Sequence, residues 1–127
     1  MATQFTFKLP DEPGSLATVA EVIGKTGINI DAIAGFSING QGIITILASN
    51  AETAETALKD ANVNFSTQDV LLIRLQDKPG QVAMLTRALA EEGINLNTFY
   101  VTMTGQQVIG TDNIARTKEI AKDFGIV

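Results

Sequence analysis

The sequence contains no cysteine and no histidine, and this absence removes several classes of chemistry. Disulfides, thiolate nucleophiles, Ser-His-Asp triads and nearly all zinc, copper or iron sites depend on these two residue types. We therefore expect no metal and no cofactor. A cysteine-free chain suits a reducing compartment, and the first residues lack the basic and apolar segments of a signal peptide. The sequence thus predicts a cytoplasmic protein.

Positive charge and long apolar runs are also scarce. Nine Lys and Arg face 14 Asp and Glu, for a net charge of −5, whereas a protein that neutralises phosphates carries clustered basic residues. No stretch approaches the roughly 18 apolar residues of a membrane span. Neither nucleic acid nor a membrane is an expected partner. The chain is 45% hydrophobic and 18% charged, which is typical of a globular protein with a core.

The chain repeats itself. Residues 9–33 align without a gap to residues 75–99, at the separation between Pro13 and Pro79. The identical positions fall at a turn and at a helix end, which chance does not explain. They are Leu9, Asp11, Pro13, Gly14, Ala17, Gly27, Ile28 and Asn29, matched by Leu75, Asp77, Pro79, Gly80, Ala83, Gly93, Ile94 and Asn95. The sequence predicts two repeats, at residues 1–68 and 69–127.

Each repeat begins with a strand and a helix. Phe5, Phe7 and Leu9 alternate with polar residues, which indicates a strand with one buried face. The pair Pro13-Gly14 ends that strand, and apolar residues at helical spacing follow. Gly27 lies where a helix commonly ends with a left-handed residue.

A hairpin and a second helix complete the first repeat. Asn39-Gly40 and Thr104-Gly105 are hairpin turn signals. In repeat one the second strand is predicted to place Ile28, Ile30, Ala34, Phe36 and Ile38 on one face. In repeat two the alternation is blurred, so that either both faces are covered or a bulge shifts the register.

The two repeats are expected to end differently. Ser49 and Glu52 fit a capping box before the second helix of repeat one, and 63–67 can form a fourth strand. After the second helix of repeat two only Ile126 and Val127 remain, so this repeat is expected to lack its fourth strand. An uncovered sheet edge invites pairing, which favours a homodimer. The order βαββαβ predicts an α+β, ferredoxin-like fold with mainly antiparallel sheets and helices on one face.

Two motifs occur in each repeat: Asp11-Glu12-Pro13-Gly14 with Gly27-Ile28-Asn29-Ile30, and Asp77-Lys78-Pro79-Gly80 with Gly93-Ile94-Asn95-Leu96. This combination resembles the ACT domain, the regulatory module of many amino-acid biosynthetic enzymes. The resemblance covers almost the whole chain and is greatest to stand-alone tandem ACT proteins, so that no catalytic domain is expected. It implies edge-to-edge pairing of modules, amino-acid ligands at the interface and a homodimer.

The motifs also suggest how such a ligand would bind. The start of a helix offers free N–H groups to a carboxylate, and an Asp before it can accept hydrogen bonds from an ammonium group. Polar residues of the second strand would contact the remaining groups. The same residues are equally well explained as turn and helix-exit residues. The predicted ligand-binding set is Asp11, Pro13, Gly14, Ser15, Asn29, Asp31, Asp77, Pro79, Gly80, Gln81, Asn95 and Asn97.

Two other functions fit the sequence. The protein could be an interaction subunit that dimerises with or docks on a metabolic enzyme without binding a metabolite. It could also be an enzyme on a ferredoxin-like scaffold, which needs a positioned Arg or an acid-base pair. The arginines Arg74, Arg87 and Arg116 are scattered, and no phosphate-binding P-loop pattern exists. The enzyme hypothesis is therefore the weakest of the three.

Overall fold

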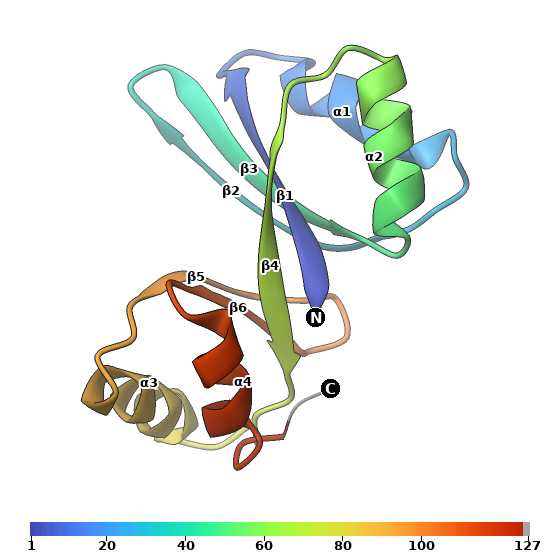
Figure 1. Ribbon diagram of the computed structural model, residues 1–127. Helices are drawn as coiled ribbons and strands as arrows, with labels where there is room; N and C mark the ends of the chain where they lie inside the picture. Colours follow the sequence, from blue (N-terminus) through green and yellow to red (C-terminus); the bar gives the residue numbers. More distant parts are fainter. Residues whose placement is uncertain (126–127) are drawn as a thin grey trace. The chain divides into compact units, whose positions relative to one another are not determined.

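The structure is a computed structural model, and it describes residues 1–125. The contacts divide the chain into two compact units (Figure 1). We call residues Thr3–Gln68 the N-terminal unit, and the residues from Asp69 onward together with Met1–Ala2 the C-terminal unit. No helix within residues 1–125 has both the length and the apolar character needed to cross a membrane.

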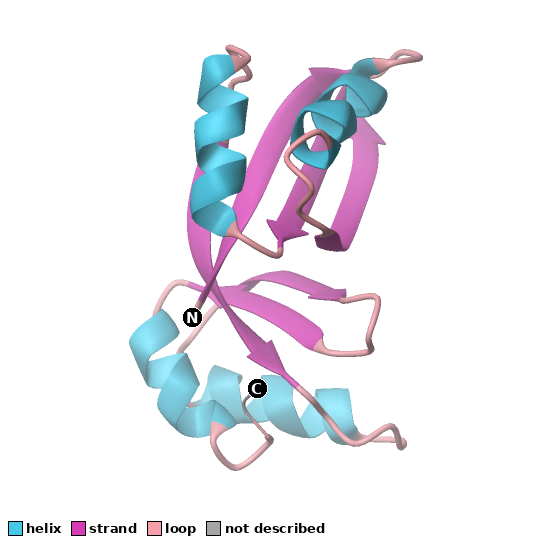
Figure 2. Cartoon of the chain, turned by 90° about the vertical axis from the view of Figure 1, so that its right-hand side faces the viewer, coloured by secondary structure: helices cyan, strands magenta, loops and turns pink. Residues whose placement is uncertain are grey.

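The N-terminal unit has the ferredoxin-like order βαββαβ. Its sheet has the strand order β2-β3-β1, with the start of β4 beside β1, and the helices α1 and α2 pack against each other and cover one face (Figure 2). β1 and β2 both run antiparallel to β3. The elements are β1 (Ala2–Pro10), α1 (Ser15–Gly24), β2 (Ile30–Ile38), β3 (Gln41–Ala48), α2 (Ala51–Asp60) and β4 (Ser66–Ile73).

The core of this unit lies between the helices and the sheet. Phe5 and Phe7 are fully buried, as their alternation predicted, and both rings contact Phe65. Val19 and Ile23 of α1 and Leu58 of α2 close the cluster from the helix side. Burying side chains of this size contributes about 1.5–3 kcal/mol each to the free energy of folding.

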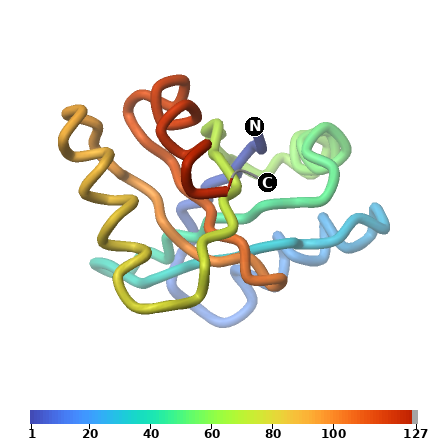
Figure 3. The backbone as a smooth tube through the Cα atoms, turned by 90° about the horizontal axis from the view of Figure 1, so that it is seen from below, coloured from blue at the N-terminus to red at the C-terminus, as the bar shows by residue number. Residues whose placement is uncertain are grey.

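The C-terminal unit repeats the arrangement. Its sheet has the antiparallel order β4-β6-β5, and α3 packs beside α4 (Figure 3). Leu71 and Ile73 of β4 and Leu85 and Leu89 of α3 are buried in its core. The elements are α3 (Gln81–Glu91), β5 (Leu96–Val101), β6 (Gln107–Thr111) and α4 (Ile114–Ala121).

The turns follow the sequence prediction. Asn39 and Gly40 both have positive φ, at 49° and 77°, which is the geometry of a two-residue hairpin turn. Gly27 and Gly93 have φ of 79° and 71° after α1 and α3, as expected for left-handed residues at helix ends.

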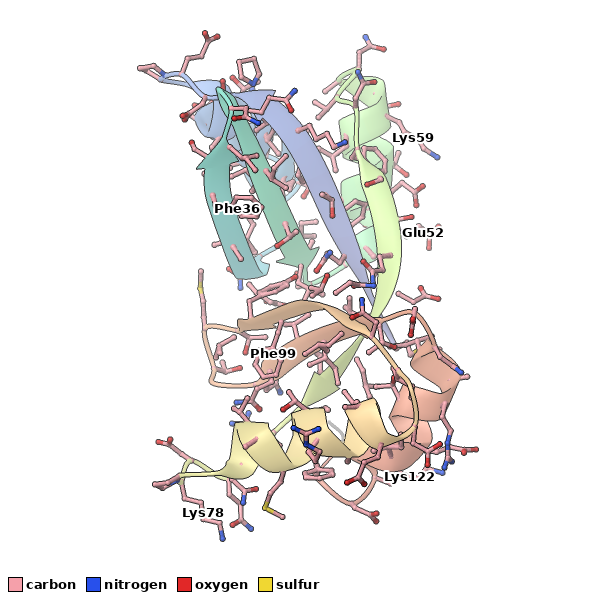
Figure 4. All side chains as sticks on the ribbon, turned by 90° about the vertical axis from the view of Figure 1, so that its left-hand side faces the viewer. Phe36, Glu52, Lys59, Lys78, Phe99 and Lys122 are labelled. Carbon is pink, nitrogen blue, oxygen red and sulfur yellow. The ribbon has the colours of Figure 1, made fainter. Side chains whose placement is uncertain are left out.

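The second strand of repeat one corrects a prediction. The register of β2 shifts between Ile30 and Ala32, just as that of β5 shifts between Leu96 and Thr98. A bulge moves the following residues to the other face of a sheet, so a register shift, one of the two alternatives for repeat two, occurs in both repeats. Consequently Phe36, opposite Ile43, points away from the helices and is 62% exposed (Figure 4).

Two other expectations for the second half of each repeat need revision. Asn50, and not Ser49, caps α2, because Asn50 Oδ1 accepts a 3.0 Å hydrogen bond from the N–H of Thr53. The fourth strand of repeat one begins at Ser66 and continues as the first strand of repeat two, so that both are the single strand β4. The prediction about 126–127 falls outside the described residues; just before them, Gly125 O accepts a 2.8 Å hydrogen bond from Arg74 N.

Candidate functional site

The loops before α1 and α3 have the same backbone geometry. Gly14 has φ 91° and ψ −14°, and Gly80 has φ 90° and ψ −11°. Each is the N-cap of its helix, and neither helix receives a side-chain cap. Left-handed φ values strain any residue with a Cβ, so the duplicated Pro-Gly pairs are explained by this backbone conformation.

The predicted acidic groups of these loops face solvent. Asp11 and Asp77 are exposed, and within residues 1–125 neither carboxylate forms a hydrogen bond or an ion pair. The backbone N–H of Asp11 donates to Gly40 O at 3.1 Å, which ties the loop to the hairpin tip. The carboxylates therefore remain available to a ligand.

The residues that follow the glycines are half-buried. Ser15 N donates to Glu12 O at 3.3 Å, and Gln81 N donates to Lys78 O at 3.4 Å. The Ser15 hydroxyl forms no hydrogen bond within the described part of the chain, whereas Gln81 Nε2 lies 3.9 Å from Met84 Sδ. Pro13 and Pro79 are exposed and directly precede the glycines.

The second motif of each repeat has structural partners. Asn29 exchanges two hydrogen bonds with Ser49: Asn29 N donates to Ser49 Oγ at 3.0 Å, and Ser49 N donates to Asn29 O at 2.8 Å. Asn29 Nδ2 donates to Asp31 Oδ1 at 2.9 Å. Asn95 is held by Asp112 in the same way, and Asn97 Oδ1 accepts from the Thr98 hydroxyl at 3.1 Å. The four predicted residues of this motif nevertheless have exposed side chains: Asn29, Asp31, Asn95 and Asn97.

The structure separates the two motifs within one unit. In the N-terminal unit, Pro10 pairs with Gln41 at one end of β3, and Gln4 pairs with Leu47 toward the other. Asp11 follows Pro10, whereas Asp31 precedes Ala32, the partner of Leu47. Six residues of antiparallel strand span about 20 Å. One amino acid cannot contact both motifs of the same unit.

The C-terminal unit shows the same separation. Ile73 pairs with Gln107 near the loop that contains Gly80, while Leu96 pairs with Thr111 at the other end of β6. Four residues of strand correspond to about 14 Å, before the length of the loop is added. The sequence analysis combined the two motifs in one site, although they flank the opposite ends of one helix, and the 11 residues of α3 span about 16 Å.

Two of the arginines considered for catalysis have structural partners. The Arg116 guanidinium contacts Glu92 through two hydrogen bonds, of 3.2 and 2.9 Å, and Glu119 through one of 2.7 Å. These bonds hold the pKa of the Glu92 carboxyl below its ordinary value. Arg74 Nη1 donates to Thr104 O at 3.2 Å. Both groups are thus engaged with the protein itself.

A shallow pocket lies beside Ser15 and was not predicted. It has a volume of about 310 Å³ and is formed by the end of β1, the first turns of α1 and the segment before β4. Residues far apart in sequence meet here, so no local pattern could have indicated it. Its lining comprises Lys8, Leu9, Pro10, Ser15, Thr18, Val19, Val63 and Asn64.

Family models match most of the chain. The ACT domain pair matches residues 40–124, and the single ACT domain matches residues 3–64. The chain belongs to the ACT domain family. The resemblance suggested by the duplicated motifs is therefore confirmed, as is the ferredoxin-like arrangement of strands and helices. Among curated proteins, none matches this ACT protein in sequence.

Solved structures of several proteins have a similar fold. A protein from Bacteroides thetaiotaomicron is 27% identical, with a TM-score of 0.88 over 99% of this chain and 91% of that chain. The regulatory subunit of aspartate kinase from Thermus thermophilus, in ligand-free form, is 17% identical, with a TM-score of 0.68 over 96% and 91%. The corresponding subunit from Thermus flavus is 18% identical, with a TM-score of 0.62 over 96% and 90%. At these lower identities the likeness concerns the fold.

Proposed function

We propose that this ACT protein is a non-catalytic, cytoplasmic regulatory protein whose two modules, 1–68 and 69–127, bind an amino acid between modules of two copies. The observation that carries the proposal is the duplicated loop before α1 and α3. Each loop combines a left-handed glycine, an exposed carboxylate and a half-buried polar side chain at a helix start. Together these groups suit a zwitterion, with the ammonium at Asp11 or Asp77 and the carboxylate at the helix start.

The separation of the motifs supports a site shared between copies. Asp11 and Asp31 lie at opposite ends of a sheet, about 20 Å apart by strand length. A second module placed alongside in the opposite direction would bring its own Asn29 and Asp31 toward the first module's Gly14. Edge strand β2 is suited to such pairing, because its residues 32–38 carry no charge and Phe36 and Ile38 are 62% and 52% exposed.

Screening the common amino acids by thermal shift tests the proposal. A ligand that binds only the native state stabilises it by about 2.7 kcal/mol at a hundredfold excess over Kd. We expect a clear rise in Tm with one amino acid or with a related group. Absence of a rise with every amino acid would reject amino-acid sensing.

Charge-neutral variants then locate the site. Asp11→Asn should weaken binding of the amino acid by about tenfold, because a charged acceptor of the ammonium is lost. Glu12→Gln is the matched control: it removes the same charge from the adjacent exposed position and should leave Kd unchanged. Equal Kd values for both variants and the wild type, measured by titration calorimetry, would exclude Asp11 from the site.

Light scattering tests the pairing of copies. We expect twice the 13.5 kDa chain mass at micromolar concentration. Phe36→Lys should yield the monomer, because a charge on the paired strand opposes association. Met84→Lys, at a 58% exposed position of α3, should leave the dimer intact. A wild-type monomer, or dissociation by Met84→Lys alone, would contradict pairing through β2.

A second function has one observation in its favour. Helix α3 exposes Met84, which borders a shallow hollow lined also by Ala83, Arg87 and Ala90. Exposed apolar helix faces commonly bind protein partners, so docking on a metabolic enzyme without a metabolite is the alternative. It predicts that no amino acid raises Tm, and that Met84→Lys abolishes co-elution with the enzyme.

A further inference from the structure

Helix α1 leaves one side uncovered by its own unit. Val19 and Ile23 are buried in the core, and Thr18 and Val19 line a hollow together with Val63, which follows α2. Successive residues of a helix are about 100° apart, so the remaining side of α1 can be identified from its sequence. We call it the α1 face, and it consists of Leu16, Ala17, Ala20, Glu21 and Gly24.

Helix α3 presents the equivalent side. The residues 66 positions further along the chain form what we call the α3 face: Val82, Ala83, Thr86, Arg87 and Ala90. The pattern of exposure is the same on both faces, with Ala20 and Thr86 half-buried and the other residues exposed. Met84 lies about 100° around the helix from Ala83, on the other side, and does not belong to the α3 face.

The two faces carry opposite charges. Glu21 is the charged residue of the α1 face, and Arg87 is the charged residue of the α3 face. Both side chains are exposed, and within residues 1–125 neither forms an ion pair. Two α1 faces placed together would bring like charges close to each other, as would two α3 faces, whereas an α1 face against an α3 face brings opposite charges together. Charge therefore favours contact between unlike faces.

The apolar residues allow such a contact to be close. Leu16 is 37% exposed and Val82 is 51% exposed, so each face has one larger apolar side chain. An antiparallel contact centred on the two charged residues would place Leu16 opposite Ala90 and Val82 opposite Gly24. Each larger side chain would then meet a small residue, as in the packing of ridges into grooves between helices.

The edges of the two sheets suit the same pairing. β2 is an outer strand of the sheet β2-β3-β1, and β5 is an outer strand of the sheet β4-β6-β5. Residues 32–38 of β2 and residues 96–101 of β5 carry no charge, and uncharged edge strands pair readily with another chain. α1 leads into β2 and α3 leads into β5, so each helix face belongs to a unit with an open edge.

We propose that two copies of the chain pair through unlike units. The α1 face of each copy contacts the α3 face of the other, the Glu21 carboxylate pairs with the Arg87 guanidinium, and β2 lies beside β5. This inference rests on the proposed function and deepens it, because it specifies which modules form the amino-acid site. The loop at Gly14 then faces Asn95 and Asn97 of the second copy in place of the corresponding residues of a like unit.

Charge reversal tests the pairing. Sedimentation velocity at low salt measures the dimer dissociation constants of the wild type, Glu21→Lys, Arg87→Glu and the double variant. We expect each single variant to weaken the dimer by about tenfold, because two attractive pairs become repulsive, and the double variant to restore it. If like units pair, each single variant merely exchanges one pair of like charges for another. Unchanged constants in both single variants, or no recovery in the double variant, would overturn the proposal.

A variant of α2 provides the control. Glu52→Lys makes the same charge reversal at an exposed position of α2 and should leave the dimer constant unchanged. Equal weakening by Glu52→Lys and Glu21→Lys would reduce the effect to net charge and reject the pairing. A wild-type monomer would also overturn the proposal and would leave the α3 face to a partner enzyme.

Thermal shift separates this inference from the proposed function. An amino acid that raises Tm, combined with wild-type dimer constants in both single variants, would support amino-acid binding and reject the pairing of unlike units. Weakening in the single variants and recovery in the double variant, without any rise in Tm, would support the pairing and reject amino-acid binding. The two proposals therefore fail separately.

Discussion

Asn95 and Asp112 exchange two hydrogen bonds: Asn95 N donates to Asp112 Oδ1 at 3.0 Å, and Asp112 N donates to Asn95 O at 3.2 Å. Asn29 and Ser49 form the equivalent pair in the other unit, at 3.0 and 2.8 Å. In both units the pair joins the start of the second strand to the residue after the third. The backbone at the Asn of the second motif is thus fixed by the protein itself, whereas the Asn side chain takes no part in these two bonds.

Asp112→Ala should lower the free energy of unfolding by about 1 kcal/mol, because Asn95 N loses its acceptor. Urea denaturation measures the change. Ser49→Ala removes the corresponding acceptor in the N-terminal unit and should have an effect of the same sign. Unchanged stability in both variants would show that water replaces these side chains without cost.

Gly80→Ala should destabilise the protein by about 1–2 kcal/mol, because φ of 90° is left-handed and strains a residue with a Cβ. Nothing lies within 4 Å of the added Cβ, so a steric clash does not contribute. Gly24→Ala is the control, since Gly24 is helical and equally open; it should stabilise by about 0.5–1 kcal/mol. Thermal unfolding measures the Tm of both variants, and a change of Tm in the same direction for the two would contradict this explanation.

Gln4→Met should leave stability unchanged or raise it by about 1 kcal/mol. Gln4 is 2% exposed, and its Oε1 has no hydrogen-bond partner within residues 1–125. Replacing such a group by an apolar side chain of similar size removes the cost of burying it. Thr117→Val should instead lower the stability, because the buried Thr117 hydroxyl forms hydrogen bonds with Thr111 Oγ1 and Asn113 O, both at 2.8 Å. A decrease in Tm for Gln4→Met would show that loss of the 3.4 Å hydrogen bond from Gln4 Nε2 to Thr6 Oγ1 outweighs this gain.

The pKa of Glu92 should rise toward 4.5 in Arg116→Gln, because the side-chain hydrogen bonds from Arg116 lower it in the wild type. A folded-state pKa below the unfolded value contributes stability above the unfolded pKa, which is lost as pH falls through the folded pKa. The contribution of the Arg116–Glu92 pair to the free energy of unfolding should therefore be present above about pH 4.5 and be lost as the pH falls below that value. NMR titration of the carboxyl groups measures the pKa of Glu92. The control is Glu119→Gln, which keeps both hydrogen bonds between Arg116 and Glu92 and should leave the pKa of Glu92 below its ordinary value.

Local patterns were sufficient to predict the elements that depend on local physics. The alternation of Phe5 and Phe7 identified a half-buried strand, and Asn39-Gly40 identified a hairpin, because side-chain period and positive φ are properties of a few neighbouring residues. The bulge after Ile30 was missed, since register is set by pairing with β3 and not by β2 alone. The cap of α2 was assigned one residue too early, because Ser49 is used by Asn29.

The sequence by itself determined the duplication, the ACT motifs and the order of strands and helices, because hydrophobic period, proline and glycine act over short segments. Only the tertiary structure decided how far apart those motifs lie. Antiparallel pairing places Asp11 and Asp31 at opposite ends of one sheet, although a single helix separates them in sequence. The same folding brings the end of β1, the first turns of α1 and the segment before β4 to one shallow pocket, since strand pairing and helix packing join residues that no local pattern connects.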